Sequence, residues 1–149
     1  MHLKIITIKK KRKENEDLST ALGGKKGSWK EQKELKTSSG IVVHVDDYVM
    51  IQLEVERNGE VINIPTPCQV LGLYFSSNKK QKIITIQWCQ SLQEYRREHK
   101  IFSCPKKSEK KWILTTHTQE IDVDSVIQVL SYRPFDYFLD LEDNTLVQL

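Results

Sequence analysis

The sequence predicts a mainly β protein, built as a small, strongly bent antiparallel sheet or partial barrel with short helical turns. Short segments of alternating apolar and polar residues recur from residue 41 onward and are joined by turn sequences. Residues 82–88 alternate most clearly, because Ile84, Ile86 and Trp88 fall on one face of an extended chain. The Asn-Gly pair at residues 58–59 is typical of a two-residue hairpin turn, since both residues accept positive φ angles.

Each expected element lies between two turn signals. Asp46 and Asp47 divide residues 41–56 into two short strands, because Asp side chains compete for local backbone hydrogen bonds. Pro65 and Pro67 interrupt the ladder of the strand that follows the hairpin turn, because proline lacks the N–H group. The later elements are expected in this order: a strand at 68–75, a turn at 76–81, the strand at 82–88, a short helix or loop at 90–100, a loop at 102–111, a strand at 111–117, a turn at 118–120, a strand or bend at 121–132, and a helical turn before a last strand within 133–149.

The chain is predicted to hold one β domain, residues 39–149, preceded by a basic, largely flexible arm, residues 1–38. The arm is rich in Lys, Glu, Ser and Gly, so it cannot bury enough apolar surface to offset the entropy lost on ordering. Residues 3–8, LKIITI, are the exception and form a candidate edge strand for this sheet or for a partner. No apolar run approaches the ~20 residues that cross a bilayer, and no secretory signal opens the chain, so we expect an intracellular protein without a membrane partner.

The net charge of +3 conceals a strongly uneven distribution along the chain. Residues 1–37 carry 11 basic and 5 acidic side chains, and residues 79–111 carry 10 and 3. Residues 38–78 and 112–149 are acidic, with 1 basic side chain against 5 acidic and 1 against 7. This alternation predicts a polarised surface that steers a charged partner towards one side.

Clusters of basic residues are the candidate contacts to that partner. A solvated face is the simplest explanation for one cluster alone, but phosphate backbone, the acidic surface of a histone core and, for the first run, a nuclear import signal are alternatives. The candidate nucleosome-contacting or DNA-contacting residues are Lys9, Lys10, Lys11, Arg12, Lys13, Lys79, Lys80, Lys82, Arg96, Arg97, Lys106, Lys107, Lys110 and Lys111.

No pattern in the sequence indicates catalysis, a cofactor or a metal. The GxSxG, HExxH, P-loop and GxGxxG motifs are absent, and the four histidines have no ligand-like spacing. The three cysteines, Cys68, Cys89 and Cys104, are widely spaced and odd in number, so we expect reduced, partly buried thiols. We therefore expect a protein that is not an enzyme.

Trp88 has two interpretations. A methylated ammonium group is bound by aromatic faces together with a carboxylate, and Trp88, Glu94 and Tyr95 have these residue types. With His117, they are the candidate residues of a histone-peptide pocket. The alternative is that Trp88 closes the hydrophobic core, as a tryptophan at the end of an alternating strand commonly does.

The order of four segments is similar to that of the BAH (bromo-adjacent homology) family. The segments are VHVDDYVMI, CQVLGLYF, ITIQW and KKWILTTHTQEIDVDSVIQ, and the resemblance covers roughly residues 40–138. Asp46-Asp47 takes the place of the family's Gly-Asp step, and residues 120–128 match its DEIPVSSIIG stretch well. The specificity of the resemblance lies in the order and spacing of the motifs.

The resemblance implies a β-rich chromatin module in the nucleus, which binds nucleosomes or histone tails, or mediates protein contacts in silencing, remodelling or replication-origin complexes. Such a domain stands at the N-terminus of the largest subunit of the origin recognition complex and of its silencing relatives, so the chain is expected to be a portion of a longer protein. Methyl-lysine readers of the family place tyrosines around the tryptophan. Thr66 stands at the preceding position and Cys89 and Gln90 follow Trp88, which disfavours methyl-lysine reading here.

Three functions therefore remain open. The first is a nucleosome-binding module whose basic arm and loops contact DNA phosphate or the acidic histone surface. The second is a protein–protein scaffold that pairs a sheet edge, or residues 3–8, with a strand of another subunit. The third is a small nucleic-acid-binding β barrel, which usually interleaves exposed aromatics with its basic residues, as these clusters rarely do.

Overall fold

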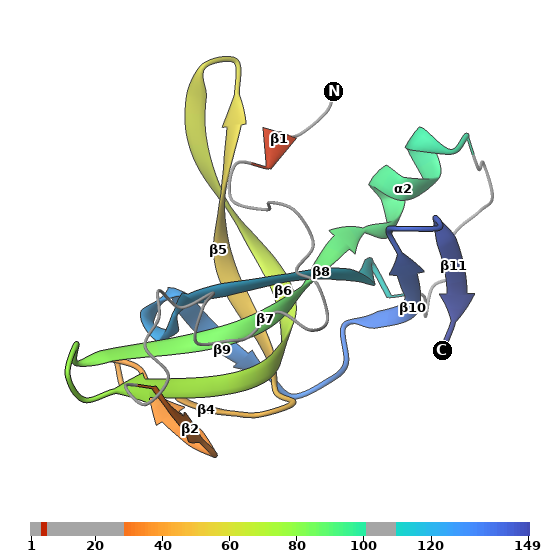
Figure 1. Cartoon of the computed structure of the whole chain (residues 1–149). Coiled ribbons are helices and arrows are strands. Elements are labelled where there is room, and N and C mark those ends of the chain that lie inside the picture. Colours follow the sequence, from red (N-terminus) through yellow and green to blue (C-terminus); the bar gives the residue numbers. More distant parts are fainter. Residues whose placement is uncertain (1–3, 6–28, 101–109) are drawn as a thin grey trace.

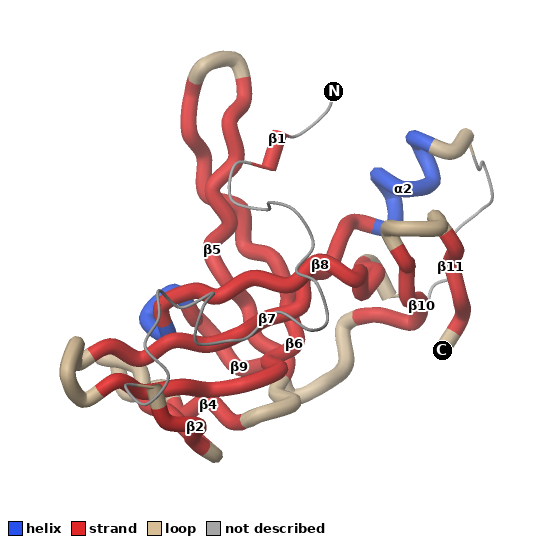
Figure 2. Tube along the Cα trace, in the orientation of Figure 1, coloured by secondary structure: helices blue, strands red, loops and turns tan. Residues whose placement is uncertain are grey.

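The computed structural model describes residues 4–5, 29–100 and 110–149 (Figure 1). Strands make up most of this part of the chain, as Figure 2 shows, and the prediction of a mainly β fold is confirmed. The elements are β1 (Lys4–Ile5), β2 (Lys30–Gln32), β3 (Glu34–Lys36), β4 (Val42–His44), β5 (Tyr48–Arg57), β6 (Glu60–Ser76), β7 (Gln81–Ser91), α2 (Leu92–Glu98), β8 (Trp112–Asp122), the 3₁₀ turn η1 (Val123–Ser125), β9 (Val126–Leu130), β10 (Phe135–Asp140) and β11 (Thr145–Gln148).

The main sheet curls around one core. Strands β5, β6, β7 and β8 pair antiparallel in chain order, and β9 returns after η1 to pair with the far edge of β5. Within the described strands β9 does not pair with β8, so the curl stays an open partial barrel. One pair differs from the expected antiparallel pattern, because β10 runs parallel to β8.

Alternation along the strands accounts for the main core. Ile84, Ile86 and Trp88 on β7 point inward together and are buried with Val70 and Leu73 of β6. Removing such side chains from water is the main stabilising contribution to a sheet of this size, at roughly 1.5–3 kcal/mol for each large apolar side chain.

The β5–β6 hairpin is set by its turn. Asn58 and Gly59 have φ angles of 53° and 80°, as a two-residue hairpin turn requires, and Arg57 lies opposite Glu60 across it. Figure 1 shows the two strands projecting beyond the rest of the sheet as a long ribbon. The turn predicted from the Asn-Gly pair is therefore confirmed.

Two prolines end the sheet on one side of this ribbon. Every second residue of β6 directs its backbone N–H and C=O groups away from β5. Counted from the Arg57–Glu60 pair next to the turn, Pro65 and Pro67 are two of these outward-facing residues. Proline offers no N–H at these outward positions, and β7 pairs with β6 only from Cys68 onward. The prolines thus interrupt the ladder on one edge only, and β6 runs through both as a single 17-residue strand.

The N-terminal boundary differs from the predicted one. Residues 30–36 were expected in the flexible arm, yet β2 pairs with β6, and β3 forms a hairpin with β4. Leu35 is only 7% exposed and belongs to the main core, which gives this segment the apolar anchor that composition alone does not indicate. Of the predicted edge strand at 3–8, Lys4–Ile5 pairs antiparallel with β5, and the remainder lies outside the described residues, as do residues 6–28 of the predicted arm.

The chain after β7 forms a second packing region. Leu92 and Tyr95 of α2 are buried with Ile113 of β8 and Leu139 of β10. A third cluster joins Cys89, Leu114 and Phe135. Residues 90–100 thus contain the helix rather than the loop, and residues 121–132 divide into the end of β8, η1 and β9. Two predictions are wrong: β8 continues through the expected turn at 118–120, and residues 133–149 hold the strands β10 and β11 joined by a turn in place of a helical turn.

Candidate functional site

Most of the described cations gather at the two ends of strand β7, the exceptions being Lys4 and Arg57. We define the turn-end cluster as the lysines around the β6–β7 turn, and the helix-end cluster as the cations around α2 and the start of β8. The turn-end cluster is Lys30, Lys33, Lys36, Lys79, Lys80 and Lys82. The helix-end cluster is Arg96, Arg97, Lys100, Lys110, Lys111 and Arg133. Figure 1 shows the β6–β7 turn and α2 at opposite ends of the molecule, so the predicted cations that lie in the described residues do not share one flank.

Strand pairing assembles the turn-end cluster. Lys30 of β2 and Lys82 of β7 both lie opposite Phe75 of β6, on its two edges, so the three residues form a row across the sheet. Lys82 Nζ donates a hydrogen bond to the Lys36 carbonyl at 2.9 Å, which ties the β3–β4 hairpin to this row. Lys79 Nζ lies 5.7 Å from the centre of the Trp29 ring, within the range of a cation–π interaction.

No pattern in the sequence places Lys30, Lys33, Lys36 or Trp29 in a site, because all four fall in the predicted flexible arm. The one sequence feature that could have indicated these lysines is their regular spacing at residues 30, 33 and 36, close to Leu35, which is buried in the structure. Trp29 Nε1 is buried and has no hydrogen-bond partner among the described residues.

The helix-end cluster is held by the start and end of α2. The Ser91 hydroxyl caps the helix by accepting the Glu94 N–H at 3.2 Å, and the Leu92 N–H donates to the Lys111 carbonyl at 2.9 Å. This second bond places Lys111 beside the helix start, while Arg96 and Arg97 occupy its last turn.

Two cations of the helix-end cluster have aromatic or acidic neighbours. Lys110 Nζ lies 5.2 Å from the Tyr132 ring centre, and Arg133 pairs with Asp136 at 3.6 Å. The predicted cations Lys9, Lys10, Lys11, Arg12, Lys13, Lys106 and Lys107 lie outside the described residues.

Trp88 is a core residue. Its side chain is 1% exposed, and its Nε1–H donates to Gln119 Oε1 at 2.9 Å. The Thr115 hydroxyl donates to the Trp88 carbonyl at 2.9 Å. The indole N–H and the carbonyl oxygen of Trp88 therefore both have hydrogen-bond partners. No face of the ring is open to a ligand.

The four predicted pocket residues do not form a pocket together. Tyr95 is buried in the cluster around α2, whereas Trp88 is buried in the main core. Tyr95 stacks instead on His99, with the ring centres 4.1 Å apart. Glu94 is half-buried on α2 and His117 half-buried on β8, in different elements. The aromatic cage is therefore a wrong prediction for Trp88 and Tyr95, because folding uses both rings for packing.

The described thiols are poor nucleophiles. Burial raises the pKa of Cys68 well above its ordinary value, with a further increase from nearby Cys89, and burial likewise raises the pKa of Cys89. Cys104 lies outside the described residues. Within the described ranges, no group of three or more His, Cys, Asp or Glu side chains has an arrangement that would hold a metal ion. Among the same residues, no helix has the length and apolar character to span a membrane.

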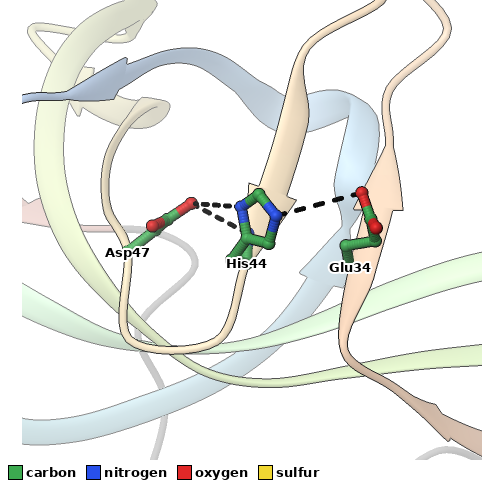
Figure 3. Close-up of polar contacts among 3 residues, drawn as sticks. All are labelled: Glu34, His44 and Asp47. Atoms are coloured by element: carbon green, nitrogen blue, oxygen red, sulfur yellow. Dashed lines mark hydrogen bonds and ion pairs between the residues drawn. The ribbon is translucent and has the colours of Figure 1, made fainter.

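Polar contacts fix the β3–β4 hairpin next to the turn-end cluster. The His44 ring lies between two carboxylates, 3.9 Å from Glu34 on the neighbouring strand and 3.7 Å from Asp47 (Figure 3). Asp47 also accepts the His44 backbone N–H at 2.8 Å and so closes the tight turn in which Asp46 has a φ of 73°. These contacts are exposed, so we interpret them as weak supports of the hairpin.

Asp124 connects this hairpin to η1. Its two carboxylate oxygens accept the Ser38 backbone N–H at 2.7 Å and the Ser38 hydroxyl at 2.8 Å. These bonds, in that order, and the nearby Lys82 lower the pKa of Asp124 below its ordinary value. The folded state therefore favours the charged carboxylate, and Asp124 stabilises the fold only while it is ionised.

Replacing Asp124 by asparagine is expected to lower the stability of the protein above pH 5 and to matter less as the pH falls. Since the pKa of the folded state is lowered, the contribution is complete above the ordinary pKa of about 4 and is lost as the pH falls through the lower folded value. Denaturant unfolding from pH 3 to 7 measures the gap between wild type and variant. Ser38→Ala is the control, because it removes one donor and keeps the backbone donor. A gap that does not change with pH would contradict the assignment.

A scan against protein-family models gave no match, and a search of curated proteins found no chain similar to this one.

Proposed function

We propose that the chain is a non-catalytic, BAH-type chromatin module that acts in the nucleus and binds nucleosomes, with its two basic clusters against DNA phosphate. The observation that carries the proposal is the turn-end cluster, in which three separate strands bring six lysines to one end of the sheet. Histone tails and other subunits of a chromatin complex are the further partners that a module of this type would contact.

The arrangement of the BAH-like segments supports the family assignment. The first segment runs from β4, which pairs with β3 in a separate hairpin, into β5 of the curled sheet, and the other three lie in β6, in β7, and in β8 through η1 to β9 of that sheet. Their inward residues Val49, Val70, Trp88 and Val126 meet in the same core. The segments thus form one structural unit, as their order in the sequence leads us to expect.

The chemistry of the turn-end cluster supports phosphate as its ligand. Lysine is a compact cation on a flexible stem, and it binds phosphate as a point charge. Arginine, in contrast, binds anions through two hydrogen bonds in a fixed geometry. The nearest carboxylate on η1, Asp124, already accepts two hydrogen bonds from Ser38. Lys30, Lys79 and Lys80 are exposed and available for a polyanion.

Reversing Lys30, Lys79 and Lys80 to glutamate is expected to weaken nucleosome binding at least tenfold in 0.1 M salt. The slope of log K against log salt is negative, and each lost phosphate contact makes it shallower by about 0.9, so three lost contacts make it shallower by about 2.7. Fluorescence anisotropy with reconstituted nucleosomes at several salt concentrations measures both quantities. Lys82 is kept, because its hydrogen bond to Lys36 supports the hairpin.

Arg57→Glu is the matched control for this experiment. It also reverses exposed positive charge, but on the tip of the β5–β6 ribbon, away from both clusters. An equal loss of affinity per charge in the control would indicate a non-specific charge effect. An unchanged affinity and salt slope in the triple variant would remove the turn-end cluster from the function.

One observation favours the alternative of a protein–protein scaffold. Strand β11 pairs only with β10 among the described strands, its residues 145–148 carry no charge, and Val147 is 48% exposed. Uncharged open edges are suited to pairing with a strand of another protein. A chain that binds neither nucleosomes nor DNA, yet is retained by subunits of a chromatin complex, would support this alternative.

A further inference from the structure

The length of strand β7 sets an upper limit on the backbone distance between the two basic clusters. Strand β7 has 11 residues and connects the β6–β7 turn directly to α2. At roughly 3.3 Å per residue, its ends lie at most about 33 Å apart. Because β7 is paired on both sides, with β6 and with β8, this spacing is a property of the folded sheet.

The surface between the clusters has no positive charge from β7. Residues 83–91 carry no charged side chain, and five of them are buried. The cations therefore form two separate footprints, and a ligand that neutralises both must present negative charge at two places up to about 33 Å apart.

Duplex DNA has a repeat close to this upper limit. The phosphates that face one side of a duplex recur with each helical turn, about 34–36 Å or 10–10.5 base pairs along the axis. The agreement favours a duplex over a single compact acidic patch on a protein, which would occupy only one cluster. It also favours a duplex over single strands, which need several stacking aromatics next to the cations. Within the described residues, the lysines that lie over an aromatic ring are Lys79 over Trp29 and Lys110 over Tyr132, one in each cluster.

We propose that the turn-end and helix-end clusters bind the phosphates of one DNA duplex at positions one helical turn apart. This inference rests on the proposed DNA contact of the module and adds its geometry. Each cluster alone binds weakly and without sequence preference. Together they make the protein bivalent for DNA, because binding of one cluster holds the other cluster close to its phosphates.

The test is the dependence of affinity on duplex length. DNA hairpins with stems of 6, 14 and 20 base pairs are titrated by fluorescence anisotropy at constant salt. A 6-base-pair stem spans about 20 Å and reaches one cluster, whereas a 14-base-pair stem spans about 48 Å and reaches both. We expect affinity to rise about tenfold or more between 6 and 14 base pairs, beyond the gain from additional binding positions, and to change little from 14 to 20.

We expect each of two double variants to abolish the rise in affinity between the 6-base-pair and 14-base-pair stems. Lys79→Glu with Lys80→Glu disables the turn-end cluster, and Arg97→Glu with Lys111→Glu disables the helix-end cluster. All four side chains are exposed, so circular dichroism and melting temperature are expected to match wild type. Arg57→Glu should retain the step.

The outcomes separate this inference from the proposed function. Binding of DNA without a length step, or a step that survives either double variant, overturns the two-footprint geometry and leaves the DNA contact in place. Binding of nucleosomes but not of any DNA hairpin overturns the geometry in favour of the acidic histone surface. Failure to bind nucleosomes or DNA overturns both.

Discussion

Replacing Trp88 by alanine is expected to lower the free energy of unfolding by about 3–5 kcal/mol. The ring is 1% exposed, so the substitution removes a large buried surface and leaves a cavity bounded by the paired strands β6 and β8. It also leaves the Gln119 side chain without the indole N–H that it accepts at 2.9 Å. Urea unfolding followed by circular dichroism measures the change.

Trp88→Phe is the informative control. Phenylalanine keeps most of the apolar volume and loses the indole N–H, so we expect a smaller cost, about 1–3 kcal/mol from the partner left unsatisfied. A Trp88→Ala protein that is as stable as wild type and has lost only the binding of a histone peptide would contradict the core assignment. That result would restore the aromatic pocket.

The sequence was sufficient for the parts of the fold that depend on local pattern. Strict alternation placed Ile84, Ile86 and Trp88 on one buried face, and Asn58-Gly59 specified a hairpin because few residue pairs accept two consecutive positive φ angles. Both signals are contained within a few residues, so no knowledge of distant contacts was needed.

The N-terminal boundary could not be predicted in the same way. Residues 30–36 are mostly charged, and their order comes from pairing with β6 and from one buried side chain, Leu35. A single apolar residue in a polar segment gives no periodic signal. The parallel β8–β10 pair was missed for a related reason, because the partner of a parallel strand is set by long-range packing.

The candidate site was predictable in residue type and not in arrangement. Charge counts identified the lysines at 79–82 and the cations at 96–111, but linear distance says nothing about which end of a strand each group reaches. The β6–β7 turn precedes β7 and α2 follows it, so the two groups of cations lie at opposite ends of this strand. Tyr95, seven residues after Trp88, was grouped with it by sequence proximity, whereas the α2 helix directs it into a different core cluster.

Replacing Leu139 by alanine is expected to cost about 2–5 kcal/mol, the usual range for a fully buried leucine. Leu139 is 2% exposed and is buried with Leu92, Tyr95 and Ile113. Its cluster shares no described residue with the main core, so we expect the substitution to lower the local stability of α2, β10 and β11 first. Hydrogen exchange is expected to accelerate in residues 92–98 and 135–148, while the amides of β6 and β7 between residues 68 and 88 stay protected.

Local opening of this region would have a specific functional consequence. The helix-end cluster is positioned by α2 and by the hydrogen bond from Leu92 to Lys111, whereas the turn-end cluster is positioned by β2, β6 and β7. We therefore expect Leu139→Ala to lose the affinity step between 6-base-pair and 14-base-pair stems and to keep the binding of the 6-base-pair stem. Equal acceleration of exchange in β6 and in α2 would show instead that the two cores unfold as one unit, and the two clusters would then fail together.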